Sequence, residues 1–369
     1  MTWLRHSYLL NNKCAMSKFY KYLLVVLLQV LAGVSYAIEP TWSVDFSSVF
    51  DNREGDNRYT DTKTFFFTNL APELGLKFTE SDRIAGGVVW HQPIGCEWDG
   101  HRISPTLYYR HDGGADSPWS FSMGMFPRTQ LREEMPGFLW SDSMAYTQRN
   151  IRGLLVQYRG SKGFVDAYVD WRGMQTEKQR EAFNIVVHGR VHPRGGAFFV
   201  GGHVMMNHFA LQKNAPENQH IVDNFVVNPY IGWNLGRHTG LDSLIMRIGP
   251  LLTIERNREF SEWKTPVGVW AECTAQWRWL GVKEELYAGG RQMPDYQPFR
   301  SLLYQGEPYY QSKYYSRTDV YADIYRNEFV KLRASLDFHV AQSAFTFYQR
   351  IILTVNLPGG GRPGLFRRK

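Results

Sequence analysis

Strict alternation of apolar and polar side chains over long stretches is the feature that most constrains this chain. In residues 267–279 every odd position is apolar, and every even position except Trp270 is polar or glycine. Residues 330–340 repeat the pattern, with apolar side chains on the even positions. Because successive side chains of a strand point to opposite faces, such stretches predict strands with one apolar and one polar face.

The same period, less strictly, marks most of the remaining chain. Turn-forming runs such as 112–114, 160–163, 193–196 and 236–240 separate the segments. They give fourteen to seventeen candidate strands: 41–50, 62–69, 73–79, 83–91, 103–111, 118–126, 151–159, 165–172, 182–191, 197–206, 225–235, 243–255, 267–279, 283–288, 317–325, 330–340 and 345–357. The chain is therefore predicted to be all-β.

A soluble β-sandwich and a membrane β-barrel both contain alternating strands. The clearest segments here run to 11–13 residues, against about 5–6 in soluble sheets, and such a length crosses a bilayer at a tilt. The polar face also carries charges of both signs, such as Asp166, Asp170 and Arg172. We therefore predict a transmembrane antiparallel up-and-down β-barrel, with an even strand number of 14 or 16.

Composition and charge fit an exported barrel. Aromatic residues reach 15%, which suits strands and the aromatic girdles of membrane barrels. The net charge of +7 comes from the two ends, since residues 1–37 and the tail after Leu357 each carry four basic residues and no acid. The body between them is slightly acidic, so no nucleic-acid partner is expected.

Residues 16–37 have the order of a secretory signal peptide. Lys18 and Lys21 precede a short apolar run, and Ser35 and Ala37 supply the small residues before a cleavage point. We expect a signal peptide at 1–37, with Met16 as a possible true start, a barrel at 38–357 and a disordered basic tail at 358–369. Ile38 follows the cleavage point, so no lipoprotein anchor is expected.

Charged side chains on the polar faces are the candidate functional residues. We expect them to line the lumen, either screening solutes in a pore or pairing with one another across strands. They are Asp166, Asp170, Arg172, Arg247, Glu272, Arg278, Lys331, Arg333, Asp337, His339 and Arg350.

Other chemistry is weakly supported, and no metal, cofactor or catalytic residue is assigned. His188 and His192, like Ser335 and His339, are four apart, which is about 13 Å on a strand. The oxygen-rich run from Asp51 to Asp61 lacks the order of an EF-hand and is expected to be a loop with at most loose calcium binding. Cys96 and Cys273 are expected to be unpaired.

Eight short segments, taken in order, resemble a family of porin-like, poorly characterised outer-membrane β-barrels. They are Phe50–Glu54, Pro72–Leu76, Gly124–Arg128, Asn150–Leu155, Asp170–Trp171, Gln179–Phe183, Arg317–Asp319 and Gln349–Asn356. The resemblance implies a fold and an outer-membrane location rather than an activity. The residues after Leu357 depart from it, because such barrels usually end on their last strand.

The expected function is a porin-like passive channel for small hydrophilic solutes, with outer-membrane lipid and the barrel-assembly machinery as partners. Two alternatives stay open. One is a lipid-modifying barrel enzyme with a lipid-facing Ser and His, and the other is a structural or surface-binding barrel with a plugged lumen.

Overall fold

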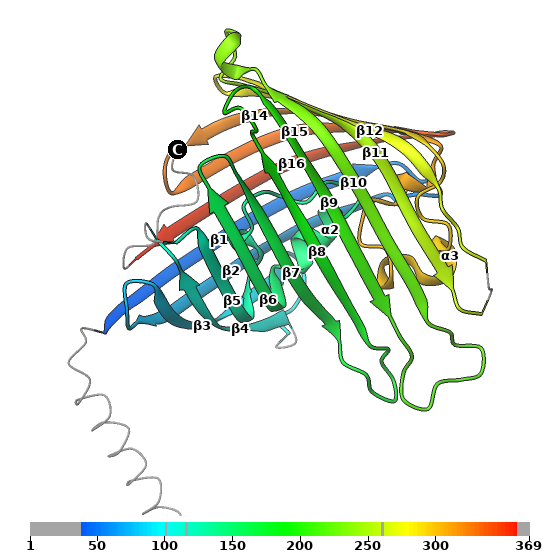
Figure 1. Ribbon diagram of the computed structural model, residues 1–369, viewed down its shortest axis with the longest axis horizontal. Coiled ribbons are helices and arrows are strands. Elements are labelled where there is room, and N and C mark those ends of the chain that lie inside the picture. The colour runs from blue at the N-terminus through cyan, green and yellow to red at the C-terminus, as the bar shows by residue number, and fades with distance from the viewer. Residues whose placement is uncertain (1–37, 100–101, 115–116, 260–261, 360–369) are drawn as a thin grey trace, which may run out of the picture.

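Sixteen antiparallel strands close into a single barrel in the computed structural model, which describes residues 38–99, 102–114, 117–259 and 262–359. The expected signal peptide, and the tail from residue 360, lie outside the described residues. Each strand pairs with its neighbours in sequence, and β1 pairs with β16 to close the ring (Figure 1). The predicted all-β, up-and-down barrel is confirmed, with 16 strands.

The strand bounds are β1 (Glu39–Glu54), β2 (Lys63–Lys77), β3 (Asp82–Pro93), β4 (Ile103–Asp112), β5 (Trp119–Pro127), β6 (Asn150–Gly160), β7 (Gly163–Gly173), β8 (Ala182–Val191), β9 (Phe198–Phe209), β10 (Val222–Asn234), β11 (Ser243–Asn257), β12 (Val267–Trp277), β13 (Leu280–Gly289), β14 (Tyr314–Arg326), β15 (Val330–Ala341) and β16 (Ala344–Pro358). The short helices are η2 (Arg128–Gln130), α2 (Asp142–Thr147), η3 (Gly236–His238), α3 (Tyr296–Phe299), η4 (Arg300–Leu302) and η5 (Pro308–Gln311). Every helix in the described part of the chain is too short or too polar to cross a bilayer.

Several strand bounds differ from the sequence prediction, and one difference joins two predicted strands. Residues 62–69 and 73–79 were expected as two strands, but they form the single strand β2. Pro72 breaks the alternation without ending the strand, since it lacks only the N–H that one ladder bond would use. Pairing of β2 with β3 is interrupted between Leu70 and Glu73, while β1 stays paired through Pro72.

The outward face forms an apolar band bordered by aromatic side chains. Trp42, Trp119 and Trp277 are exposed near one end of the wall, and Trp171 and Tyr314 near the other. The two longest connections, residues 128–149 and 290–313, both lie at the second end. Since outer-membrane barrels have short periplasmic turns and long extracellular loops, that end is the extracellular one.

Candidate functional site

The inward face of the wall carries charged and polar side chains on almost every strand. Ten of the eleven predicted residues lie on this face: Asp166, Asp170, Arg172, Arg247, Glu272, Lys331, Arg333, Asp337, His339 and Arg350. Some of them meet, because Arg247 lies 3.7 Å from Glu272, and Arg350 forms an ion pair with Asp337. Others pair with residues outside the predicted set, as Arg333 does with Asp323 at 2.6 Å.

Arg278 is placed differently from the prediction. Strand β12 ends at Trp277, and Arg278 occupies the tight turn to β13 with a positive φ of 54°. Its guanidinium lies over the ring of Trp277, 5.0 Å from the ring centre. The alternation of residues 267–279 continues into the turn, where it no longer reports which face a side chain takes.

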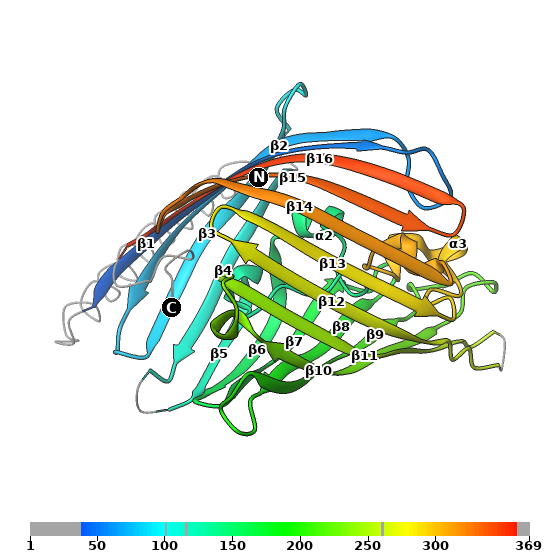
Figure 2. The same ribbon diagram turned by 90° about the horizontal axis from the view of Figure 1, so that it is seen from above.

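Two long connections fold back into the barrel instead of extending away from it. Residues 128–149, the first inward loop, carry η2 and α2, and residues 290–313, the second inward loop, carry α3, η4 and η5. Figure 2 shows both within the ring of strands. Together they form the plug of the lumen.

The first inward loop begins with an arm, residues 128–133, that is fixed to the wall by charge. Arg128 bonds to Asp170 at 2.5 Å, and the backbone N–H of Arg132 donates to Asp166 at 2.7 Å. Glu133 then accepts ion pairs from Arg190 at 3.0 Å and from a second arginine, Arg247, at 3.1 Å. Three strands of the wall thus hold one short segment across part of the lumen.

Helix α2 crosses to the other side of the barrel. Ser141 caps it, since its hydroxyl accepts from the N–H of Met144. Asp142 then accepts hydrogen bonds from Arg317 on β14 and Arg350 on β16, both at 2.9 Å. Burial opposes the charge of Asp142, but the two guanidinium groups outweigh it and hold its pKa below the usual range.

Strand β1 supplies a second anchor for α2. Arg53 pairs with Asp51 at 2.7 Å and donates to the hydroxyl of Ser143 at 3.2 Å, while the Tyr146 hydroxyl donates to Asp51 at 3.0 Å. Asp51 points inward, whereas Asn52 on the outward face accepts from Thr64 at 2.8 Å. The oxygen-rich run expected as a loop is therefore split, because β1 extends to Glu54 and sends its side chains to opposite faces.

The second inward loop is held mainly by hydrogen bonds to its aromatic hydroxyls and backbone. Tyr304 donates to Glu255, both at 5% exposure or less, and Tyr310 donates to Glu285. The carbonyls of Leu302 and the next residue accept from Arg172 at 2.8 Å and Asn207 at 2.7 Å. The predicted residue Arg172 therefore contacts the plug.

The two inward loops are joined through their backbones. The N–H of Ser141 donates to the carbonyl of Gln305, and the N–H of Glu307 donates to the carbonyl of Gly137, each at 2.7 Å. A Cβ at Gly306 would lie 2.2 Å from the carbonyl oxygen of Phe138, so only glycine permits this approach. The Glu307 carboxylate also accepts the N–H of Asp142, and burial, followed by the charge of Asp142, raises the pKa of Glu307.

Aromatic packing fills the space between the plug and one side of the wall. Trp270, the exception to the alternation, is fully buried against Phe138 and donates from its indole N–H to Glu285 at 2.9 Å. It faces inward, but onto the plug and not onto water. A cavity of about 20 Å³ between the second inward loop and the wall holds at most a single water.

Part of the inward face nevertheless stays in contact with solvent. Lys283, which points inward from β13, keeps 35% of its side chain exposed while lying 3.2 Å from Glu272. Arg333, which points inward from β15, keeps 28%. The plug therefore leaves a solvated, charged portion of the lumen.

Metal and nucleophile candidates from the sequence do not form sites in the described part of the chain. No group of three potential metal ligands occurs there. Ser335 and His339 both face the lumen and are buried, so neither can reach lipid. Both Cys96 and Cys273 are free, as expected.

A plugged lumen was kept as an alternative from the sequence, but the two segments that form the plug were not identified. The visible signal was indirect, because residues 128–149 and 290–313 have no alternation and are longer than the usual connections of about 4–6 residues. Such length indicates a functional loop, but it does not say whether the loop folds inward.

Solved structures with the same architecture are outer-membrane proteins. OpdL of Pseudomonas aeruginosa matches with a TM-score of 0.53 and 11% identity, over 87% of this chain and 99% of that one. OprD of the same organism gives 0.50 and 7%, over 86% and 94%. A loop L8 deletion mutant of OmpT from Vibrio cholerae gives 0.50 and 9%, over 86% and 99%. The resemblance to outer-membrane barrels inferred from short motifs is confirmed at the level of the fold.

Sequence comparison adds one finding. No curated protein matches the chain. A family model described as lipid A 3'-O-deacylase-type matches residues 39–358, from the first residue of β1 to the last residue of β16. The chain therefore belongs to the lipid A 3'-O-deacylase-type family.

Proposed function

We propose that the protein is a porin-like passive channel for small hydrophilic solutes in the outer membrane, with the plug as its constriction. The observation that carries the proposal is the solvated, charged inward face. Lys283 and Arg333 point into the barrel yet keep 35% and 28% of their side chains exposed. Exposed charges inside a closed wall require water, and a water-filled lumen lined by charge screens solutes by sign and size.

The constriction is electrostatic as well as steric. A solute passing the plug meets arginines that are each matched by a nearby carboxylate, such as Arg247 beside Glu133 and Arg317 beside Asp319. Balanced pairs give no strong preference for one sign of charge. The proposed solutes are therefore small, polar molecules and ions selected more by size than by charge.

Conductance across a planar bilayer tests the channel. We expect discrete current steps from the purified protein, with weak ion selectivity. Lys283→Gln should shift permeability toward cations, because it removes a positive charge of the lumen and leaves Glu272 with Arg247 at 3.7 Å after losing the nearer partner at 3.2 Å. Lys178→Gln in an exposed loop should not shift it. Absence of current steps from folded protein would eliminate the channel and leave a plugged structural barrel or an enzyme.

Family membership favours a second candidate, an enzyme that removes an acyl chain from lipid A. This function needs a nucleophile or activated water on the lipid side of the wall, and the inward Ser335 and His339 cannot supply it. Incubation of the purified protein with lipid A, followed by mass measurement of the lipid, tests it directly. Release of one acyl chain by the wild-type protein would establish the enzyme whatever the conductance.

We also propose that the chain is delivered to the membrane by the barrel-assembly machinery. Closure requires β1 to pair with β16 along twelve residue pairs, from Ser43–Pro358 to Glu54–Phe347. These strands are the farthest apart in sequence, so closure waits until the whole chain is present. Depletion of the assembly machinery should leave the protein unfolded in the periplasm.

A further inference from the structure

The periplasmic rim of the barrel carries an uneven distribution of exposed charge. Four turns that follow one another along the rim, β6–β7, β8–β9, β10–β11 and β12–β13, each contain one exposed basic residue, and together they form the basic arc: Lys162, Arg194, Arg237 and Arg278. Elsewhere on the rim the β14–β15 turn exposes Glu328, and the β2–β3 turn exposes Glu80. The basic arc is therefore a candidate surface for an anionic partner.

The basic side chains of this arc have little negative charge beside them. Asp242 is the only acidic residue in the four turns, and its carboxylate accepts the backbone N–H of Arg278. The guanidinium of Arg278 lies instead over the ring of Trp277, 5.0 Å from the ring centre. Four basic residues against one acid leave the arc positive and open to an anion.

Aromatic side chains place the basic arc at the level of the lipid headgroups. Trp277 and Trp279 are about half exposed at the β12–β13 turn. Phe198 and Trp233 contact each other edge to face next to the β8–β9 and β10–β11 turns, with 5.8 Å between their ring centres. Because exposed aromatic residues, tryptophan above all, mark the boundary between hydrocarbon and water, the basic side chains of turns this short lie at the depth of the phosphate groups.

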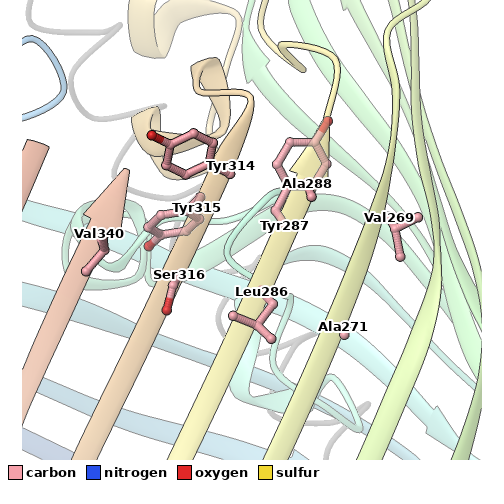
Figure 3. Close-up of a pocket in the computed structure, with 9 residues that line it drawn as sticks. All are labelled: Val269, Ala271, Leu286, Tyr287, Ala288, Tyr314, Tyr315, Ser316 and Val340. Carbon is pink, nitrogen blue, oxygen red and sulfur yellow. The ribbon is translucent and has the colours of Figure 1, made fainter. Parts of the chain in front are cut away.

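The outer face of the wall beyond the β12–β13 turn suits acyl chains. Towards the extracellular end it has a hollow of about 410 Å³ between β12 and β15, lined by apolar and small side chains such as Val269, Ala271 and Leu286 (Figure 3). The outward residues of β12 and β13 include no lysine or arginine. At this hairpin, outward positive charge is therefore found at the rim and not along the wall.

We propose that the basic arc binds the phosphate groups of anionic phospholipids in the periplasmic leaflet. Neighbouring turns are two strands apart, about 10 Å, which is about one Debye length at physiological salt, so their positive potentials overlap. One basic residue near an anionic membrane surface strengthens the attraction about fivefold. The surface needs neither conductance nor catalysis, so its failure leaves those proposals intact.

Native mass spectrometry of the protein released from nanodiscs with equal amounts of phosphatidylglycerol and phosphatidylethanolamine tests the surface. The site variant combines Arg194→Gln and Arg237→Gln, on neighbouring turns of the basic arc. The matched control combines Lys178→Gln and Lys213→Gln, which remove the same charge from exposed extracellular loops. Folding of each variant is checked by its faster migration in an unboiled gel.

We expect the wild-type protein and the control to retain phosphatidylglycerol in preference to phosphatidylethanolamine, and the site variant to lose about fivefold of this preference. An unchanged preference in the site variant would overturn the proposal. An equal loss in the control would overturn it as well, because net charge and not the rim would then set the preference. A wild-type protein that shows no preference for phosphatidylglycerol but sediments with peptidoglycan would assign the arc to the cell wall instead.

Discussion

Replacing Asp142 by Asn removes the charge that ties helix α2 to the far wall. The carboxylate accepts one bond from Arg317 and one from Arg350, each at 2.9 Å. Hydrogen bonds to charged groups contribute about 1.5–3 kcal/mol each, so the pair contributes about 3–6 kcal/mol. Both arginines keep other carboxylate partners, Asp319 and Asp337, so we expect the lower end, about 3 kcal/mol.

A loss of about 3 kcal/mol changes the ratio of docked to undocked plug by about a hundredfold. In single-channel recordings, Asp142→Asn should show more frequent and longer openings than the wild type, at a higher mean current. Asp61→Asn makes the same change at an exposed position in the loop between β1 and β2, and should leave the recordings unchanged. If Asp142→Asn opened as often and for as long as the wild type, the result would refute either the anchoring role of the Arg317 and Arg350 bonds or the idea that the plug limits the current.

Three further perturbations address the same plug. Burial raises the pKa of Glu307, so protonation of this carboxyl stabilises the docked plug. This stabilisation is fully present below about pH 4 and is lost as pH rises through the raised pKa. Openings should therefore increase from about pH 5 to about pH 9, and Glu307→Gln should flatten this dependence in the same recordings. Gly306→Ala places a Cβ 2.2 Å from the Phe138 carbonyl and should separate the two inward loops, seen as faster proteolysis of residues 128–149 than in Gly196→Ala, where a Cβ meets open space. Trp270→Ala empties a fully buried site at a cost of about 3–5 kcal/mol; the temperature at which the compact gel band disappears should fall further than for Trp277→Ala, which is half exposed.

The wall could be predicted because each strand has lipid on one side and polar groups on the other. These two environments impose an alternation of apolar and polar residues with a period of two. Lipid outside and polar groups inside leave little freedom in β12 and β15, where the alternation is strict. The alternation weakens at positions where a side chain does not contact the environment that is usual for its face of the strand. Trp270 faces inward onto the aromatic plug, and Glu284 faces outward, where it accepts hydrogen bonds from Ser316 and Thr318.

The plug could not be predicted because its residues do not face one constant environment on each side, so no regular alternation of apolar and polar residues marks them in the sequence. Asp142 and Glu307 are separated by 165 positions in sequence and meet only after both connections fold inward. Their partners, such as Arg53, Arg317 and Arg350, read as ordinary lumen charges, and nothing in their spacing shows that they bind a loop. The prediction of paired lumen charges gave the right kind of interaction but not its partners.

The backbone bonds between the two inward loops decide how any opening must occur. Two backbone hydrogen bonds, from Ser141 to Gln305 and from Glu307 to Gly137, join each loop to the other. Each loop is also continuous at both ends with strands of the wall at the same rim. Movement of one loop therefore drags the other, and a current trace should switch between two levels in single jumps, without a ladder of intermediate values.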